Sequence, residues 1–155
     1  MDKIKNVVFD LGGVLVGIDL NRCIAAFRKL GMDAVAEIIN PYYPAEMIGR
    51  LEHGDITFHE ACNQMRALSG TPEVTDDEIA RAYGEFLTEI PVAKLRQIDD
   101  LRRRGFRTYV LSNNNTASME YVRRMFTADG KTMDDYFDAV YLSYELHELK
   151  PSEAI

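Results

Sequence analysis

Short apolar runs alternate along this chain with longer stretches in which apolar residues have helical spacing. The runs are rich in β-branched and aromatic residues and predict three buried β-strands, over residues 4–9, 106–111 and 139–142. Apolar positions three or four residues apart fill most of the chain between the first two runs. The pattern predicts an α/β fold in which a helical region, residues 17–90, separates the first strand from the rest of the sheet.

Capping residues mark where several predicted helices begin and end. An N-cap or a capping box precedes an apolar helical stretch at three places, namely Asp19, Thr57 with Glu60, and Thr75 with Glu78. Pro91 is expected at the first position of a further helix, and Gly105 just past its end. One more helix is predicted over residues 115–126, because its apolar residues share one side.

Composition and charge narrow the class of protein. The chain has 155 residues, of which 46% are hydrophobic, enough for one substantial core. Its formal net charge of −7 argues against nucleic acid or an anionic membrane as a partner. The basic run 102–104 is interpreted as the solvated end of a helix, where cations complement the helix dipole. We find no signal peptide and no long apolar span, which predicts a cytoplasmic protein.

The cysteines and histidines lack the spacing of a metal site. Cys23 and Cys62 fall inside predicted helices and form no CxxC pair, so neither a disulfide nor a zinc site is expected. His53, His59 and His147 show no metal-ligand spacing and are interpreted as ordinary surface or half-buried residues.

The end of the first apolar run carries the most informative residue. Asp10 follows this run directly, and Gly12 and Gly13 come next. In open α/β sheets, ligands bind just beyond the carboxyl ends of the strands. Glycines let backbone N–H groups approach a ligand closely. A phosphate cradle alone would not select an acidic residue at its centre, whereas a carboxylate that attacks phosphorus or holds Mg²⁺ would.

Two more polar segments follow the later strands. Ser112, Asn113 and Asn114 come at the end of the second run, and Lys150 lies in a loop after the third. Parallel strands would bring these residues and Asp10 to one edge of the sheet, as a nucleophile, a hydroxyl donor and a positive charge for an anionic group. Taken separately, the serine and asparagines are also typical turn formers and the lysine a typical surface residue. The joint pattern favours a site.

Three ordered segments resemble the motifs of the haloacid dehalogenase-like (HAD) hydrolase superfamily. The segments similar to its first, second and third motifs are 9–15 (Phe-Asp-Leu-Gly-Gly-Val-Leu), 111–113 (Leu-Ser-Asn) and 150–151 (Lys-Pro). The helical insertion is similar to the family's type-1 cap, and residues 16–22 resemble a branch that includes sugar-phosphate phosphatases. The resemblance implies a Rossmann-like parallel sheet formed by 1–16 and 91–155, incomplete in this chain, with a helical cap over 17–90.

The resemblance also implies roles for the strand-end residues. Asp10 would attack phosphorus and form an aspartyl-phosphate that water then hydrolyses. Ser112 would donate a hydrogen bond to a phosphoryl oxygen, and Lys150 would offset the charge of Asp10 and the phosphate. Further phosphate- and substrate-binding positions are implied at Gly12, Gly13, Asn113 and Asn114. Mg²⁺ is the implied cofactor, held by the Asp10 carboxylate and the Gly12 carbonyl, and the substrate is a small phosphorylated metabolite, with sugar phosphates as a candidate class.

Two departures from the family pattern reduce the expected activity. Gly12 stands where family phosphatases commonly carry an aspartate that acts as general acid and base, a contribution of about 10²–10⁴-fold. The fourth motif, an acidic pair that completes the Mg²⁺ site, is expected after Lys150 and does not occur in the chain. We therefore predict a C-terminally truncated chain with weak activity or none. Its first strand would be an exposed edge that invites a homo-oligomer or a strand-swapped dimer.

Other functions are compatible with parts of the pattern. One alternative is a HAD-like binding or interaction module that has lost catalysis, which Gly12 and the missing motif favour and the retained Asp10, Ser112 and Lys150 oppose. A dinucleotide-binding domain is disfavoured, because the glycines are not spaced G-x-G-x-x-G. Substrate choice is expected to depend on the cap, where the candidate residues serve equally well as cap core: Tyr42, Tyr43, Met47 and His53.

Overall fold

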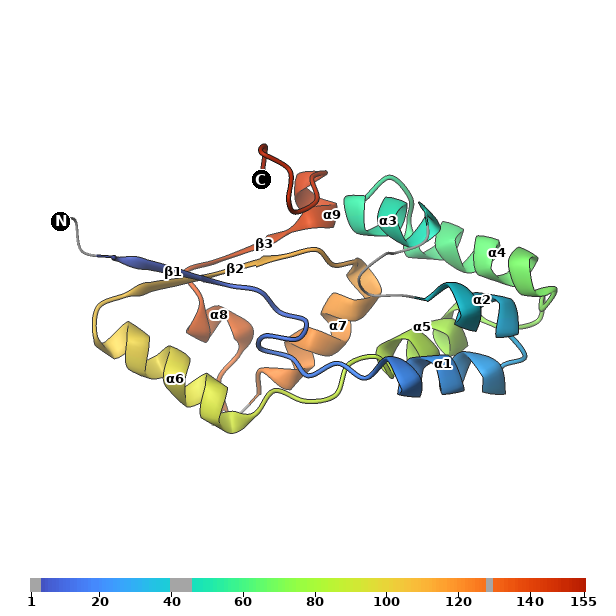
Figure 1. Ribbon diagram of the computed structural model, residues 1–155. Coiled ribbons are helices and arrows are strands. Elements are labelled where there is room, and N and C mark those ends of the chain that lie inside the picture. The colour runs from blue at the N-terminus through green and yellow to red at the C-terminus, as the bar shows by residue number, and fades with distance from the viewer. Residues whose placement is uncertain (1–3, 40–45, 128–129) are drawn as a thin grey trace.

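The computed structural model describes residues 4–39, 46–127 and 130–155. Its sheet has three parallel strands in the order β1-β2-β3, namely β1 (Asn6–Phe9), β2 (Arg107–Ser112) and β3 (Ala139–Leu142). The predicted strand positions are confirmed, although β1 begins later than expected and β2 is displaced by one residue. Parallel pairing brings the carboxyl ends of the strands to one edge of the sheet, at the right of the sheet in Figure 1.

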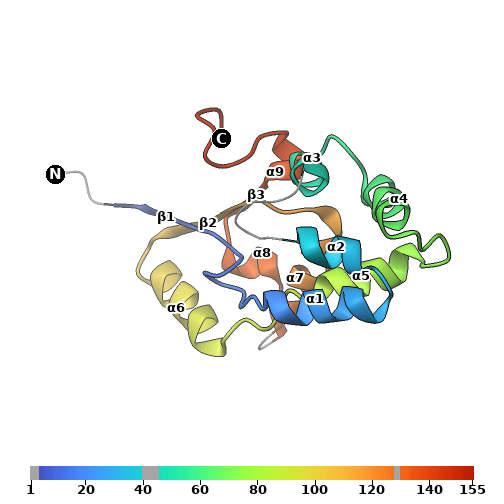
Figure 2. The same ribbon diagram turned by 45° about the vertical axis from the view of Figure 1, so that its right-hand side comes forward.

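The described helices form two groups. Along one side of the strands lie α6 (Val92–Arg103), α7 (Thr116–Met125) and α8 (Met133–Tyr136), and the one-turn α9 (Ser143–Leu146) follows β3 (Figure 1). The second group gathers beyond the carboxyl ends of the strands (Figure 2): α1 (Leu20–Lys29), α2 (Asp33–Ile38), α3 (Glu46–His53), α4 (Phe58–Ser69) and α5 (Asp76–Gly84). The predicted helical insertion between the first two strands is thus present.

Local capping explains where several of these helices begin. The Asp19 carboxylate accepts hydrogen bonds from the N–H groups at the start of α1, and both predicted capping boxes, at the starts of α4 and α5, are formed. Gly105, with φ +87, follows the end of α6 as predicted. Pro91 is the N-cap of α6 rather than its first helical residue, because its ψ of 129 is extended. The helix therefore starts one residue later than the sequence indicates.

Two apolar clusters stabilise the two groups of helices. Under the sheet, Val110 and Leu142 of the strands pack with Ile98 of α6 and Val122 of α7. A second cluster lies inside the helical region and includes the fully buried side chains of Cys23, Phe27, Met32, Met65 and Ile79. Phe86 packs against both clusters. The helical region therefore has its own core, joined to the core of the sheet near Phe86.

The opposite face of the sheet is open in the described part of the chain. Val8 of β1 and Tyr141 of β3 are 58% and 44% exposed, and Ile4 before β1 is 77% exposed. The prediction of a buried strand is therefore wrong for β1, whose residues are exposed or half-buried. The physical reason is that β1 lies at an edge and the described helices cover only one face. Tyr109 and Tyr141 stack on the sheet with ring centroids 6.4 Å apart.

Two chain segments connect the sheet to the helical region, and they pair with each other. The Gly17 N–H donates to the Glu89 carbonyl and the Thr88 N–H donates to the Gly17 carbonyl, each at 2.8 Å. Further along, the Asp19 N–H donates to the Phe86 carbonyl at 2.8 Å. A Cβ on Gly17 would lie 2.2 Å from Thr88 Oγ1, so a side chain there would force Thr88 to shift. The connections therefore form a short antiparallel ladder.

A polar cluster joins α6 to the sheet at the amino ends of β2 and β3. Asp138 Oδ2 accepts hydrogen bonds from the Thr108 N–H and the Arg102 guanidinium, both at 2.8 Å. The Thr108 hydroxyl donates to the Tyr136 carbonyl at 2.6 Å. The hydrogen bond from Thr108, together with Arg102, lowers the pKa of Asp138. Arg102 is therefore engaged by the fold, which corrects the interpretation of the whole basic run as solvated.

The described residues contain neither clustered metal ligands nor a helix that could span a membrane. Residues 4–39, 46–127 and 130–155 contain no cluster of three or more metal-ligating His, Cys, Asp or Glu side chains. Cys23 and Cys62 are free and buried, and burial raises the pKa of each thiol to about 12. Within the same ranges, no helix combines the length and the apolar content needed to cross a bilayer.

We expect Asp138→Ala to lower the free energy of unfolding by about 1.5–3 kcal/mol, because hydrogen bonds to a charged group are lost. The pKa of Asp138 is lower in the folded state than in the unfolded state, where it is about 3.9. The stability that Asp138 contributes is therefore fully present above pH ~3.9 and is lost as the pH falls through the pKa of the folded state. Urea denaturation between pH 7 and pH 2 measures both effects.

The control for this prediction is Asp134→Ala, which removes a carboxylate whose side chain is 83% exposed and should change the free energy of unfolding by less than about 0.5 kcal/mol. Equal losses of unfolding free energy in the two variants would contradict the role of the polar cluster. A difference in unfolding free energy between them that persists at pH 2 would contradict it too.

Candidate active site

Asp10 is the first residue after β1 and lies where the carboxyl ends of the strands meet. Its Oδ1 accepts a hydrogen bond from the Leu11 N–H at 2.8 Å and lies 3.0 Å from Nζ of Lys150. The following loop is tight, because the Leu11 carbonyl accepts the N–H groups of residues 14–16. The half-buried carboxylate therefore has a defined orientation and a cationic partner.

Lys150 is fastened to the loop after β2 through both its backbone and its side chain. Its N–H donates to Asn113 Oδ1 at 2.8 Å, and Asn113 Nδ2 donates back to the Lys150 carbonyl at 3.1 Å. Its Nζ donates to the Leu111 carbonyl at 3.0 Å, besides the ion pair with Asp10. Lys150 is distant from Asp10 in the sequence, and Asn113 holds it beside the Asp10 carboxylate.

Ser112 is the last residue of β2 and is 2% exposed. Its hydroxyl donates to the Asn113 carbonyl at 3.3 Å, which is long for a hydrogen bond between oxygens. Its Oγ is therefore weakly engaged and can turn to a ligand. The structure thus brings together the predicted residues Asp10, Ser112, Asn113 and Lys150.

These residues line one cavity of about 460 Å³ between the sheet edge and the helical region. The side toward the sheet is formed by Asp10, Gly12, Ser112, Asn113 and Lys150. The side toward the helices is mostly apolar and includes Ile18, Ile39, Ile48 and Phe86, with Glu52 and Tyr83 among them. A polar, charged floor and an apolar roof suit a small ligand with an anionic end.

Two predicted ligand-binding residues lie outside this cavity lining. The Gly13 N–H donates to the Val16 carbonyl at 2.8 Å, and its φ of +74 favours glycine. The Asn114 N–H donates to Ser143 Oγ at 2.9 Å, and Asn114 Oδ1 accepts from the Asn115 N–H at 2.8 Å. Their hydrogen bonds serve the turns beside the cavity.

Glu52 and Tyr83 also line the cavity, although no motif in the sequence points to them. Burial raises the pKa of Glu52 to about 7. Burial is also the main cause of a raised pKa at Tyr83, and the charge of Glu52 adds to it, which places the two groups near each other. Glu52 lies four residues after the buried Ile48 on α3, so both share a helix face. A carboxylate on an apolar helix face is the signal that would have identified it.

The cap residues proposed from sequence have other surroundings. His53 Nδ1 lies 2.9 Å from Asp55 Oδ1, and Met47 packs against the core of the helical region. Neither residue lines the cavity. Tyr42 and Tyr43 lie outside the described residues.

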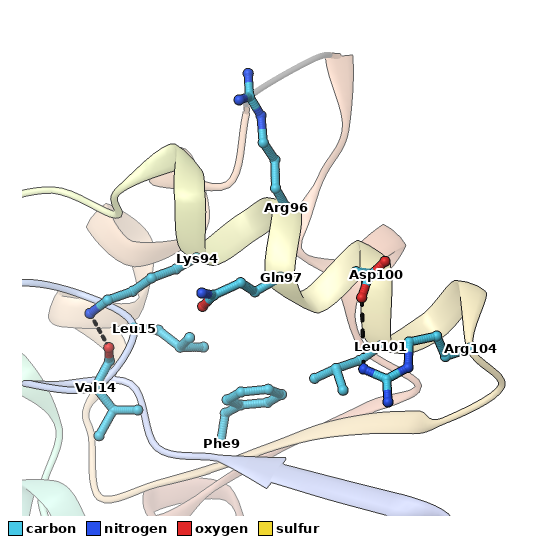
Figure 3. A pocket seen from close by; sticks show the side chains of 9 residues that line it. All are labelled: Phe9, Val14, Leu15, Lys94, Arg96, Gln97, Asp100, Leu101 and Arg104. Atoms are coloured by element: carbon cyan, nitrogen blue, oxygen red, sulfur yellow. Dashed lines mark hydrogen bonds and ion pairs between the residues drawn. The ribbon is translucent and has the colours of Figure 1, made fainter.

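A second hollow, of about 580 Å³, lies between β1 and α6 (Figure 3). Phe9, Leu15 and Leu101 form its apolar floor, while Lys94 donates to the Val14 carbonyl at its rim. It contains none of the predicted catalytic or phosphate-binding residues. The chemistry therefore points to the cavity that holds Asp10.

Comparisons with known proteins agree with this geometry. D-ribitol-5-phosphate phosphatase from Bacteroides thetaiotaomicron is 37% identical over 153 residues, which are 98% of this chain and 73% of that protein. A HAD family enzyme from Bacteroides thetaiotaomicron, solved with magnesium and inorganic phosphate, gives a TM-score of 0.89 at 35% identity over 97% of this chain and 74% of its own. A predicted HAD-like hydrolase from Porphyromonas gingivalis gives 0.81 at 33% identity, over 97% and 71%.

The family model for haloacid dehalogenase-like hydrolases matches residues 4–155. This match covers the three segments on which the resemblance rests, and the similarity to solved HAD enzymes confirms the predicted α/β fold class. Magnesium, the predicted cofactor, is bound in a solved relative. This chain belongs to the haloacid dehalogenase-like hydrolase family.

Proposed function

We propose that the protein is a phosphatase of small phosphorylated metabolites in which Asp10 is the nucleophile. The observation that carries this proposal is the convergence of Asp10, its 3.0 Å partner Lys150 and the buried Ser112 on one cavity. Among the described residues, the hydrogen bond and the ion pair of the Asp10 carboxylate both involve Oδ1. The second carboxylate oxygen is therefore left to attack a phosphorus atom.

The residues support a reaction in two steps. Asp10 forms a bond to phosphorus while the bond to the leaving oxygen breaks and its electron pair stays on that oxygen. Water then attacks the aspartyl-phosphate, restores the carboxylate and releases inorganic phosphate. Lys150 and the Ser112 hydroxyl stabilise the charge on the phosphoryl oxygens. Gly12 supplies no acid, so substrates with a good leaving group depend least on the missing proton donor.

The oxygen donors at the sheet edge fit Mg²⁺. Asp10 offers a carboxylate and Gly12, which lines the same cavity, a backbone carbonyl. Mg²⁺ is commonly bound by one or two carboxylates together with water and substrate phosphate. When bound, the ion neutralises negative charge on the phosphate. The described residues hold no cluster of three ligating side chains, so Asp10 and Gly12 would hold the ion with few protein ligands. Weak activity of this chain is therefore still predicted.

We assign residues 17–90 as a cap and residues 1–16 and 91–155 as the core domain. Three features support the assignment: the separate apolar cluster of the helical region, the paired connections near Gly17 and Thr88, and a cavity whose walls come from both parts. The relative named D-ribitol-5-phosphate phosphatase favours a sugar or polyol phosphate as substrate. The cytoplasmic location stays a prediction.

Asp10→Asn is expected to lower Mg²⁺-dependent hydrolysis of p-nitrophenyl phosphate by roughly 10³-fold or more, because an amide is a poor nucleophile. Turnover rates with and without Mg²⁺ measure the effect. The control is Asp33→Asn, which alters a carboxylate whose side chain is 74% exposed and should leave the rate unchanged. A folded wild-type chain without turnover would favour the alternative of a binding module that has lost catalysis.

Asn113→Ala is expected to reduce kcat/KM for p-nitrophenyl phosphate by roughly tenfold to a hundredfold, because the backbone of Lys150 loses both hydrogen bonds to the Asn113 side chain. If Asn113 acts through the lysine, the variant Asn113→Ala adds little to the loss already caused by Lys150→Ala. A double-mutant cycle tests this coupling. Fully additive losses would show that Asn113 does not act by positioning Lys150.

We also propose that the open edge of β1 pairs with a second copy of the chain. An edge strand presents unpaired backbone groups, and Ile4 and Val8 add exposed apolar side chains beside it. Val8→Lys is expected to convert a dimer into a monomer, measured by size-exclusion chromatography with light scattering. Tyr141→Lys, on the opposite edge strand, should leave the dimer intact. A wild-type chain that is monomeric at every concentration contradicts the pairing.

A further inference from the structure

The roof of the active-site cavity contains two polar side chains in apolar surroundings. Glu52 of α3 and Tyr83 of α5 are flanked there by the following side chains from the helical region: Ile18, Cys23, Ile39, Ile48 and Phe86. Among the described residues, no hydrogen bond or ion pair engages the Glu52 carboxylate. Glu52 is half-buried and lines the cavity, so this carboxyl, which the described residues leave without a partner, is placed to bind a polar group of a ligand.

The position of Glu52 is tied to the phosphate-binding side of the cavity. The Ser143 hydroxyl donates to the Glu52 carbonyl at 2.5 Å, and Ser143 Oγ also accepts a hydrogen bond from the Asn114 N–H at 2.9 Å. Asn114 directly follows Ser112 and Asn113. The α3 helix also packs against α9. The carboxyl is therefore held at a defined place relative to the loop that would bind phosphate.

The charges around the cavity restrict what the roof can bind. Lys150 is the one cation among the described residues that line it, and it already pairs with Asp10 on the floor. Among the described lining residues, no second cation is therefore present to neutralise a further phosphate or a carboxylate of the ligand. Glu52 would repel such a group whenever it is ionised. Burial, which raises its pKa to about 7, leaves it able both to donate and to accept a hydrogen bond.

We infer that the substrate is a monophosphate ester of an uncharged, polyhydroxylated carbon chain and that Glu52 and Tyr83 bind its hydroxyl groups at the end away from the phosphate. A carboxyl and a phenol match hydroxyls in donor and acceptor capacity, and the neighbouring isoleucines contact the carbon chain. The inference rests on the proposed phosphatase function and adds the residues that select the substrate and the requirement that its far end be uncharged. It excludes bisphosphates and phosphorylated acids as preferred substrates.

The test compares two substrates that share the phosphate but not the hydroxyls, D-ribitol 5-phosphate and p-nitrophenyl phosphate. Glu52→Leu and Tyr83→Phe are each expected to lower kcat/KM for D-ribitol 5-phosphate by roughly tenfold to a hundredfold, mainly through KM. Both should change kcat/KM for p-nitrophenyl phosphate by less than about threefold, because that substrate has no hydroxyl to bind. Glu52→Gln, which keeps a donor and an acceptor, should recover most of the affinity.

The matched control is Glu46→Leu, which makes the same change on the same helix at an exposed position outside the cavity. This variant should leave kcat/KM unchanged for both substrates. Equal losses on both substrates after Glu52→Leu would overturn the inference and indicate a structural role. A fall in kcat with unchanged KM would assign Glu52 to proton transfer instead. Faster turnover of a bisphosphate or a phosphorylated acid than of polyol phosphates would also overturn it.

Binding separates failure of this inference from failure of the proposed function. Calorimetric titration of the Asp10→Asn chain with D-ribitol 5-phosphate requires no turnover. Binding that is lost when Glu52→Leu is added supports the polyol site even if the wild-type chain hydrolyses nothing, an outcome that would refute only the phosphatase proposal. Binding that survives Glu52→Leu unchanged, or no binding to the Asp10→Asn chain, overturns the inference.

Discussion

The parallel pairing of β1 with β2 determines where the candidate site residues lie. Phe9 is opposite Val110, so Asp10 and Ser112 leave neighbouring strands at the same sheet edge, and the pairing of Ser112 with Leu142 brings the end of β3 beside them. A slip of one residue would turn every side chain of a strand to the other face. The register thus places a carboxylate beside a hydroxyl, and the loop after β3 can then bring a lysine to both.

The uncharged side chains of Asn113 and Ser143 connect the sheet edge to residues outside the sheet. The Asn113 amide exchanges hydrogen bonds with the backbone of Lys150, and the Ser143 hydroxyl joins the loop after β2 to the carbonyl of Glu52. Ser143 does not line the cavity, and Asn113 contributes to its wall as well as to its support. Loops from distant parts of the chain thereby share one set of hydrogen bonds. The floor and the roof of the cavity are positioned together.

Local signals in the sequence identified the parts of the structure that depend on neighbouring residues. Short apolar runs gave the strands, Asp19 and the two capping boxes gave helix starts, and the ordered motifs gave Asp10, Ser112 and Lys150. Contacts between distant residues were not accessible in this way. Arg102 is engaged because Asp138 meets it in space, and the open face near Val8 depends on which elements cover the sheet. The position of Glu52 in the cavity could not be identified from sequence, because the cavity that it lines is formed by residues distant along the chain.

Gly12 and Gly13 differ in whether the backbone requires glycine. Gly13 has a φ of +74 and favours glycine, whereas a Cβ on Gly12 would meet, among the described residues, Ile18 Cγ2 at an ordinary 3.8 Å. The backbone therefore does not demand glycine beside Asp10. A single base change converts a glycine codon into an aspartate or a glutamate codon, so an acidic side chain at this position is one substitution away. The turn that presents Asp10 can therefore accept a side chain at position 12 without a change of its backbone.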